Sequence, residues 1–352
     1  MVGHLAHPER PGGRRRVVAL PAGAGDRGPG HAGGAAVSDA VLVTGASGYV
    51  GALAVEALTA ADLGPVVALD LRPPAAPRAG VVEVTGDLRE VDLPALLRDH
   101  GVGAVVHLAS VVEPPPGMDP ATLHDIEVGG TRRVVEACVA AGVDHLTVTS
   151  SGAAYGYTPR NRDRLLTEDD PVPGHPRFAY ARHKAEVEAL LADARRTHPQ
   201  LGQLVLRPGT ILGPGTDNQI TALFTGRVVL GLSDTDVPFV FVHDRDVARV
   251  IGTGVVQRTT GMFNLAGEGV LTLRDIAALE GARYLPLPPG LVRAALTVGH
   301  RARLVRYGPE QVDFLRYRPV LDGSAARAAF PDAITHTTAD CYAAFREGRA
   351  RG

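Results

Sequence analysis

The stretch TGASGYVG at residues 44–51 decides the fold expected of this 352-residue chain. A short aliphatic run at 41–43 precedes it, and a segment of helical composition at 50–61 follows it. Glycines at such a turn permit close approach of the backbone to a pyrophosphate, and the helix N-terminus offers free N–H donors and a partial positive charge. The stretch therefore predicts a strand, a tight turn and a helix that together bind a dinucleotide.

An acidic residue at the expected distance supports the same prediction. Asp70 ends the next apolar run, 19 residues after Gly51. A carboxylate near that offset accepts hydrogen bonds from the adenosine ribose and repels a 2′-phosphate. We therefore expect NAD as the cofactor. NADP is less favoured, although the neighbouring Arg72 and Arg78 could accept a phosphate.

Short apolar runs alternate with longer segments rich in Ala, Leu and Glu along the chain. Their apolar continuity is typical of strands that are buried on both faces. The expected strands are 41–43, 66–69, 81–84, 104–108, 146–149 and 204–206, with later ones at 239–242 and 262–265. The expected helices are 50–61, 93–100, 131–141 and 178–196. This alternation predicts an α/β fold with a doubly wound parallel sheet, the Rossmann arrangement.

The chain is expected to divide into three parts. Residues 1–38 are rich in Gly, Pro, Arg and Ala, which predicts a disordered tail. Residues 39–267 form the expected NAD-binding Rossmann domain, with part of the substrate lobe inserted near 213–238. Residues 268–352, helical and punctuated by prolines, form the expected small C-terminal substrate-binding lobe.

Charge and composition exclude several classes of protein. The formal net charge of −2 gives no electrostatic footprint for nucleic acid or an anionic membrane surface. No apolar run approaches the ~18 residues of a transmembrane helix. Cys138 and Cys341 are the only cysteines, too few for a disulfide framework and without metal-ligand spacing around them. We therefore expect a cytoplasmic protein without a metal site.

Lysine is almost absent from the chain. Lys and Arg total 36, and Lys184 is the only lysine. It follows Tyr180 by four residues, so the two side chains share one face of a helix. An ammonium at that distance favours the phenolate, which makes Tyr180 a usable base or acid near neutral pH. The alternative is a chance pair on an exposed helix.

A pair of serines follows the expected strand at 146–149. In parallel α/β sheets, ligands bind beyond the carboxyl ends of the strands, which would place Ser150 and Ser151 at the cofactor crevice. A hydroxyl beside Tyr180 could hydrogen-bond a substrate oxygen and stabilise charge that develops there. Turn chemistry is the alternative explanation for two serines at a strand end.

With further motifs in the same order, the chain resembles the extended short-chain dehydrogenases/reductases, the group named NAD-dependent epimerase/dehydratase. The match runs from 41 to 345. Besides the features above, it rests on GDL at 86–88, VVHLAS at 105–110, SSGAAYG at 150–156, LRPGTILGPG at 206–215, FVHDRDVA at 241–248 and FNLAG at 263–267. This set is highly specific for the family and much less specific for the substrate.

The resemblance implies roles for individual residues. Ser151, Tyr180 and Lys184 would be the catalytic set, in which Lys184 also binds the nicotinamide ribose. The implied cofactor-binding positions are Gly45, Ser47, Gly48, Tyr49, Val50, Gly51, Asp70, Asp87, Leu88, Ala109, Lys184 and Pro208. The resemblance also implies a homodimer formed through the helices at 131–141 and 178–196.

Departures from the family pattern narrow the expected chemistry. Family dehydratases carry an Asp-Glu pair directly after the catalytic hydroxyl, where this chain has Gly152 and Ala153, which argues against sugar dehydration. Nucleotide-sugar members commonly have Asn where this chain has Thr210, and Arg where it has Phe239, so good phosphate and carbohydrate donors are missing. Residues that could compensate are Arg207, Arg245 and Arg249. Glu127 also departs, because many members have a structural Asn at its position.

The leading hypothesis is an NAD-dependent oxidoreductase that transfers a hydride between NAD(H) and a carbinol or carbonyl carbon of a small-molecule substrate. One alternative is a sugar or nucleotide-sugar epimerase that uses transient oxidation by tightly bound NAD. A second alternative is a non-catalytic NAD(P)-sensing protein. The intact Ser151/Tyr180/Lys184 set argues against this last one, because such a set degenerates when chemistry is abandoned.

Overall fold

The computed structural model describes residues 40–351, except 219, 303–304 and 306–307. The chain divides into two units, residues 1–37 and residues 38–352, and the description below concerns the second. The tail predicted at 1–38 lies outside the described residues.

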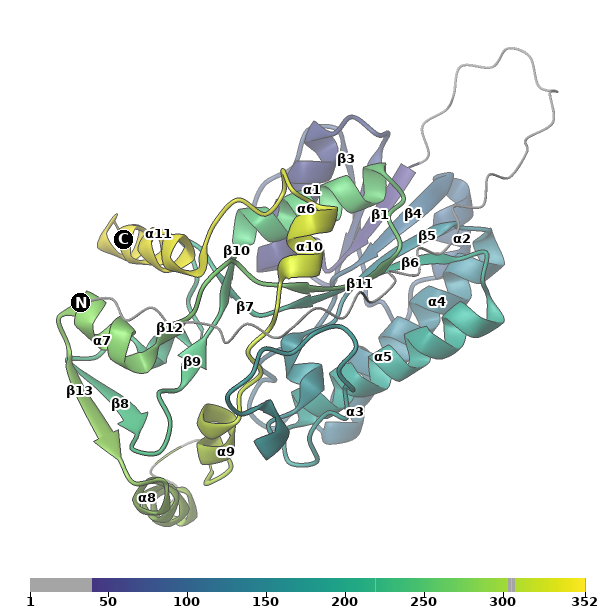
Figure 1. The fold of residues 1–352 in the computed structure, drawn as a ribbon. Helices are drawn as coiled ribbons and strands as arrows, with labels where there is room; N and C mark the ends of the chain where they lie inside the picture. The colour runs from purple at the N-terminus through teal and green to yellow at the C-terminus, as the bar shows by residue number, and fades with distance from the viewer. Residues whose placement is uncertain (1–39, 219, 303–304, 306–307, 352) are drawn as a thin grey trace, which may run out of the picture. The chain divides into compact units, whose positions relative to one another are not determined.

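A seven-stranded sheet forms the centre of the protein (Figure 1). Every pairing in it is parallel, and the strand order is β11-β6-β5-β4-β1-β2-β3. The strands are β1 (Ala40–Thr44), β2 (Val66–Asp70), β3 (Val81–Thr85), β4 (Val102–His107), β5 (His145–Thr149), β6 (Gly202–Pro208) and β11 (Gly261–Leu265). Each predicted apolar run of the sheet became a strand, which confirms the predicted doubly wound fold.

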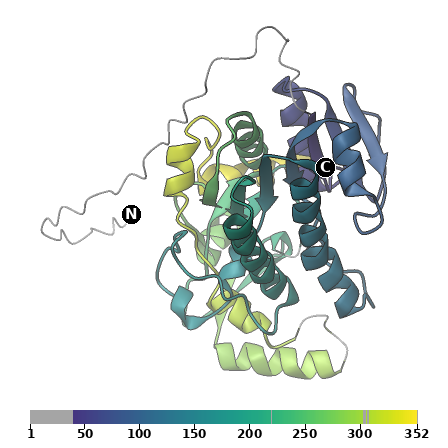
Figure 2. The same ribbon diagram turned by 90° about the vertical axis from the view of Figure 1, so that its right-hand side faces the viewer.

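Helices cover both faces of this sheet, as Figures 1 and 2 show. One layer contains α1 (Tyr49–Ala60) and α6 (Asp244–Val256); the other contains α2 (Leu93–Asp99), α4 (Gly130–Ala141) and α5 (Ala179–Thr197). Alternate residues of β1 supply the two cores, because side chains of a strand alternate in direction. Val41 and Val43 pack in the core cluster with α1 and α6, whereas Leu42 packs with α2, α4 and α5.

The helix α4 is preceded by segments that the sequence pattern did not reveal. A short α3 (Pro120–His124) runs into a π-helical turn, η1 (Asp125–Gly129), which continues directly into α4. The wider π turn places one extra residue in the helix, and such turns are frequent at functional sites. Glu127 lies in this turn and is buried.

A smaller lobe is built from two separate parts of the chain. Val228–Leu232 (β8) pairs with Arg283–Leu287 (β13), and Pro238–Phe239 (β9) pairs with Leu271–Thr272 (β12). Thr210–Leu212 (β7) and Phe241–His243 (β10) form a third pair. The helices of this region are α7 (Leu273–Glu280), α8 (Pro289–Arg301), α9 (Gln311–Arg316), α10 (Ser324–Ala329) and α11 (Thr338–Arg351).

The last part of the chain also returns to the central sheet. Ala326 of α10, together with Phe330, packs in the same core cluster as α1 and α6. Phe345 of α11 instead packs in the core of the small lobe, beside Phe224 and Phe241. Described residues after position 267 thus contribute to both cores. The expected domain boundary at 267 stays a prediction.

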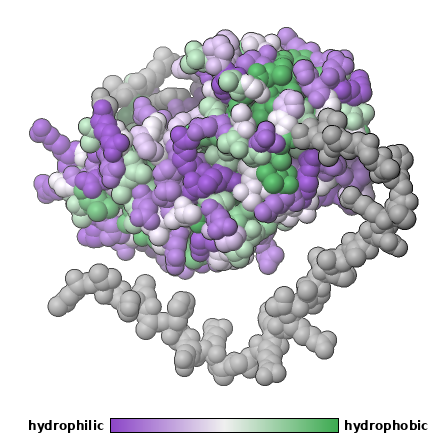
Figure 3. All heavy atoms as spheres, turned by 90° about the horizontal axis from the view of Figure 1, so that it is seen from above, coloured by the Kyte–Doolittle hydropathy of each residue, from purple (hydrophilic) through white to green (hydrophobic). Residues whose placement is uncertain are grey.

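The surface in Figure 3 is mainly hydrophilic, with small hydrophobic patches among the polar residues. Among the described residues, no helix combines the length and apolar character needed to span a bilayer.

Candidate functional site

The glycine-rich turn has the conformation and the tight packing that its composition predicts. Gly45 has φ +72°, and a Cβ on it would lie 2.6 Å from the backbone nitrogen of Ala109. A Cβ on Gly51 would lie 1.9 Å from the Gly45 carbonyl oxygen. Side chains at either position would therefore fill the turn or push it away from β4. Gly48 begins α1 without a side-chain cap, so the helix N-terminus keeps donors for an anionic ligand. These residues fit a dinucleotide pyrophosphate.

Asp70 lies at the end of β2, directed toward this turn. Its Oδ2 accepts a hydrogen bond from the Ser47 backbone N–H at 2.9 Å, and its Oδ1 accepts one from the Arg72 N–H at 3.0 Å. Arg78 is paired with Glu83 at 2.7 Å and also donates to the Ala46 carbonyl. Because Arg78 is already committed to a carboxylate, the structure weakens the argument that this arginine accepts the 2′-phosphate of NADP.

Several of the other predicted cofactor residues lie at the carboxyl ends of strands of the central sheet. Ala109 follows β4 and approaches Gly45, and Leu88 contacts Gly130 at the start of α4. Asp87 pairs with Arg89 at 2.6 Å, and the hydrogen bond from Arg89 holds the pKa of this carboxyl below its ordinary value. Two further side chains pack inward rather than facing a ligand: Val50 against the core, and Pro208 at the buried end of β6. Their roles in binding the cofactor stay predictions.

Tyr180 and Lys184 lie in the first two turns of α5, one turn apart. The Lys184 Nζ is 5.5 Å from the centroid of the Tyr180 ring. The ammonium also donates to the Thr149 carbonyl at 3.4 Å, and it pairs with the Glu127 carboxylate at 3.4 Å. Lys184 is only 5% exposed. Burial disfavours its charge, but Tyr180 and Glu127 outweigh burial and hold the Lys184 pKa above its ordinary value.

Ser151 lies at the start of a short 3₁₀ turn, η2 (Gly152–Tyr155), that packs against α5. Its Oγ accepts a hydrogen bond from the Ala153 N–H at 3.1 Å, and the residue is half-buried. The hydroxyl therefore retains its proton for donation to another group. Ser150 differs from the expectation that both serines face the crevice. Its hydroxyl is buried and donates at 2.6 Å to the carboxylate of Glu188, a buried residue of α5.

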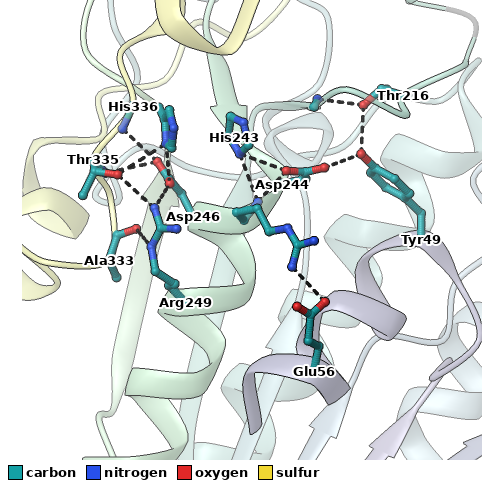
Figure 4. A network of polar contacts seen from close by, with 12 residues as sticks. Tyr49, Glu56, Thr216, His243, Asp244, Asp246, Arg249, Ala333, Thr335 and His336 are labelled. Atoms are coloured by element: carbon teal, nitrogen blue, oxygen red, sulfur yellow. Dashed lines mark hydrogen bonds and ion pairs between the residues drawn. The ribbon is translucent and has the colours of Figure 1, made fainter. Parts of the chain in front are cut away.

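A second polar network connects α1 with α6 beside the glycine turn (Figure 4). The Tyr49 hydroxyl donates to the Asp244 carboxylate and lies 3.3 Å from the Thr216 hydroxyl. Burial, and then the hydrogen bond to Asp244, raises the pKa of Tyr49 to about 12. Tyr49 therefore ties the cofactor turn to the loop after β7, and its phenol is neutral at physiological pH.

One group of described side chains has spacing that could hold a metal ion: His243, Asp246 and His336, whose ligand atoms lie within 4.8 Å of one another. Asp246 already receives contacts from Arg249, from the Thr335 and His336 backbone N–H groups, and from the His336 ring at 2.7 Å. The two imidazole rings stack 4.0 Å apart at 20°, so their in-plane lone pairs run nearly parallel and do not converge. In Figure 4, the contact between Asp246 and His336 joins α6 to the segment before α11. The expected absence of a metal stays a prediction.

Arg318 is a candidate substrate-binding residue that the sequence pattern did not reveal. Its guanidinium lies 3.9 Å from the centroid of the Phe239 ring, and it donates to the Thr210 hydroxyl at 3.0 Å. The Nε and Nη1 atoms are buried and have no hydrogen-bond partner within the described part of the chain. Burial lowers the pKa of Arg318 to about 10. Arg318 therefore contacts both Thr210 and Phe239, the two positions at which the sequence departs from the pattern of nucleotide-sugar members.

The arginines that the sequence offered as compensation are engaged elsewhere. Each of them pairs with a carboxylate: Arg207 with Glu188, Arg245 with Glu56 and Arg249 with Asp246. No sequence signal would have selected Arg318, since it is one of many arginines and lies more than 100 residues from Thr210 in the chain. Its place depends on how the C-terminal segment folds back over β7 and β9.

Comparison with known proteins agrees with this geometry. Residues 41–265 match the NAD dependent epimerase/dehydratase family. A UDP-glucose 4-epimerase of Mycolicibacterium smegmatis is 30% identical over 319 residues, which cover 84% of this chain and 96% of that protein. An uncharacterised protein of Mycobacterium tuberculosis is 26% identical over 317 residues, covering 88% of this chain and 84% of that one. The structure of MoeE5 in complex with UDP-glucuronic acid and NAD has 26% identity and a TM-score of 0.65, covering 88% of this chain and 99% of that one.

The chain belongs to the NAD dependent epimerase/dehydratase family. It is therefore an NAD-dependent enzyme built on the extended short-chain dehydrogenase/reductase fold, and the predicted family, fold and cofactor are confirmed. The non-catalytic alternative is not favoured by these relatives. The roles of individual residues in the site stay predictions.

Proposed function

We propose that this enzyme transfers a hydride between NAD(H) and a carbinol or carbonyl carbon of a small-molecule substrate, with Tyr180 as the acid/base. Three features support the proposal: a turn with no room for a Cβ at Gly45 or Gly51, the Tyr180–Lys184 pair on α5, and the Ser151 hydroxyl at the start of the adjacent η2. When bound, NAD⁺ supplies the hydride acceptor.

The residues of this chain divide the remaining work in the direction of alcohol oxidation. Tyr180, as phenolate, takes the proton of the substrate hydroxyl while the hydride leaves the carbinol carbon, so the alcohol becomes a carbonyl. Ser151 donates a hydrogen bond to the substrate oxygen and fixes its position. Lys184 would favour the phenolate by its charge and would also bind the ribose of the cofactor. In the reverse direction, Tyr180 returns the proton to the oxygen.

Arg318 points to a substrate with an anionic group. Its two unpartnered guanidinium nitrogens are buried, and a buried donor without a partner is costly unless a ligand satisfies it. Nε and Nη1 lie on opposite edges of the guanidinium, so each needs its own acceptor, and an oxygen of a carboxylate or a phosphate is a strong one. The Phe239 ring against which the guanidinium packs carries no charge, so Arg318 supplies the positive charge of this contact. We propose that it anchors a single anionic group of the substrate.

The test is to titrate the pure protein with NAD⁺ and a panel of alcohols, sugar acids and nucleotide sugars, while absorbance at 340 nm reports NADH. A dehydrogenase accumulates NADH in proportion to the product. Absence of both turnover and product inversion across a broad panel, despite bound NAD⁺, would contradict the proposal.

Epimerisation is the second candidate, because several relatives are UDP-glucose 4-epimerases. It uses the same first step, after which the keto intermediate rotates in the site and receives the hydride on its other face. Inversion of a substrate carbon without net NADH identifies this reaction. Oxidation and epimerisation therefore differ in product and not in the roles of Tyr180 and Lys184.

We further propose a cytoplasmic location and a homodimer formed through α4 and α5. Both cysteines, Cys138 and Cys341, are buried and free, as in proteins of reducing compartments. Light scattering of the purified chain tests the oligomeric state: a mass near twice 36.7 kDa is expected, whereas a monomer at all concentrations would contradict the dimer.

A further inference from the structure

Glu127 is a buried acidic residue, and the polar contacts of its carboxylate all come from donors. The Ser110 hydroxyl donates at 3.0 Å to each oxygen, and the Val111 backbone N–H donates to Oε1. The Lys184 ammonium lies 3.4 Å from Oε2. An amide side chain would present its own NH₂ donors to one of these groups, so the surroundings match a carboxylate.

The π-helical turn explains how Glu127 reaches this place. The residue lies in the middle of η1, between α3 and α4, and is 3% exposed. Thr131, one turn later, donates to the Glu127 carbonyl oxygen at 2.8 Å and also contacts the buried His107. The backbone of the turn is thus fixed from both sides, which leaves the carboxylate little freedom to move away from Lys184.

The other ionisable groups near this pair do not replace Glu127. Glu188, one turn after Lys184 on α5, is committed to Arg207 and Ser150. Burial, followed by the charge of Lys184, lowers the pKa of His107 to about 4, so it is neutral at physiological pH. Burial also lowers the pKa of His183. Glu127 is therefore the carboxylate that balances the only lysine of the chain.

We propose that Glu127 is a positioning residue for hydride transfer: its carboxylate holds the Lys184 ammonium in place and offsets part of the positive charge that this ammonium presents to Tyr180. The inference rests on the proposed function, since it assigns Glu127 a role in tuning that same site. Burial raises the pKa of Glu127, but Lys184 and the hydrogen bonds from Val111 and Ser110 hold it below its ordinary value, so the carboxylate is charged at neutral pH.

Two consequences follow for a variant without the charge. In Glu127→Gln, the lysine loses its counter-charge, so its ammonium releases its proton at lower pH than in the wild type. The variant also lacks a negative charge that opposes formation of an anion at the site. The midpoint of the rise of kcat with pH for alcohol oxidation therefore moves to lower pH.

The single lysine gives a direct test that does not depend on turnover. In protein grown with ¹⁵N-lysine, Lys184 alone produces the side-chain Nζ signal, which changes as the ammonium loses its proton. We expect the wild-type signal to remain that of the ammonium beyond the pH at which Glu127→Gln titrates, with midpoints separated by ~1–3 units. Equal midpoints in the two proteins would overturn the proposal.

Turnover provides the second measurement. Glu127→Gln should lower the midpoint of the pH–kcat profile, and Glu127→Asn, a shorter amide that also removes the charge, should do the same if the Gln variant folds poorly. Glu186→Gln is the matched control, because Glu186 lies on the same helix and pairs with the exposed His124; its profile should match the wild type. Unchanged midpoints in both Glu127 variants contradict the inference. Wild-type turnover by a Tyr180→Phe variant would instead contradict the proposed function, and the lysine titration, which needs no turnover, separates the two failures.

Discussion

Two arginines with buried guanidinium nitrogens, one in each half of the protein, differ in whether the fold supplies a counter-charge. Arg207 of β6 donates to Glu188 through Nε at 2.8 Å and to the Tyr155 hydroxyl through Nη1 at 2.8 Å. Arg318, before α10, has the Thr210 hydroxyl and two aromatic rings as its contacts, while Nε and Nη1 find no hydrogen-bond partner among described residues.

The electrostatic consequences differ in the same way. Burial lowers the pKa of both guanidinium groups, but the carboxylate of Glu188 outweighs burial at Arg207 and raises its pKa. At Arg318 no carboxylate compensates, and the pKa falls to about 10. A charge that the fold has paired stabilises the framework, whereas a buried charge left without a counter-ion marks a place where an anionic ligand binds favourably.

The largest effect is expected at the cofactor half, from Lys184→Arg. The charge is retained, but a planar guanidinium cannot occupy the compact site between Tyr180, Thr149 and Glu127. We expect kcat to fall about 100-fold or more, in the range of lost acid–base catalysis. Arg182→Lys is the control, because Arg182 lies on the exposed side of α5 near Glu186. Near-normal turnover of Lys184→Arg would remove the role assigned to the lysine.

A smaller and different effect is expected in the substrate half, from Arg318→Met. Loss of a charged hydrogen-bond donor to an anionic substrate should raise KM about 10- to 100-fold, with little change in the affinity for NAD⁺. Arg274→Met removes an arginine that also lies over an aromatic ring of the lobe, that of Tyr284 at 4.7 Å. We expect it to leave KM unchanged. Equal KM values for the wild type and Arg318→Met would end the comparison between the two arginines.

The smallest effect concerns the choice of cofactor. Asp70→Ala removes the carboxylate proposed to bind the adenosine ribose, so the preference for NAD⁺ over NADP⁺ should fall about tenfold. Adding Glu83→Gln frees Arg78 from its ion pair and should reduce the preference further. The ratio of kcat/KM for the two cofactors measures both changes. An unchanged ratio in Asp70→Ala means that the specificity is set elsewhere.

The cofactor half could be predicted from sequence because its signals are local. The inner strands of the sheet are largely apolar runs buried on both faces, and the glycine turn is defined by residues within eight positions of one another. Tyr180 and Lys184 needed only helical spacing. Ser150 was misplaced, because the sequence does not show which of two adjacent serines turns toward Glu188.

The substrate half could not be predicted in the same way, because it depends on distant pairings. β8 joins β13 across an interval of about 50 residues, and Arg318 reaches Thr210 and Phe239 only after the C-terminal segment folds back. Glu127 stood out as a departure from the family, but its contact with Lys184 depends on the π-helical turn, which no composition pattern predicts. Long-range contacts of this kind leave no periodic signal in the sequence.

The initial rate of NAD(H)-dependent conversion by Tyr180→Phe, measured beside the wild type with the same substrate, tests the central claim most directly. The phenylalanine ring preserves the packing on α5 but can neither accept nor return the substrate proton. We predict a rate about 10²–10⁴-fold lower, with NAD⁺ binding by calorimetry unchanged. A Tyr180→Phe enzyme that turns over at the wild-type rate would contradict the assignment of this site as the centre of hydride transfer.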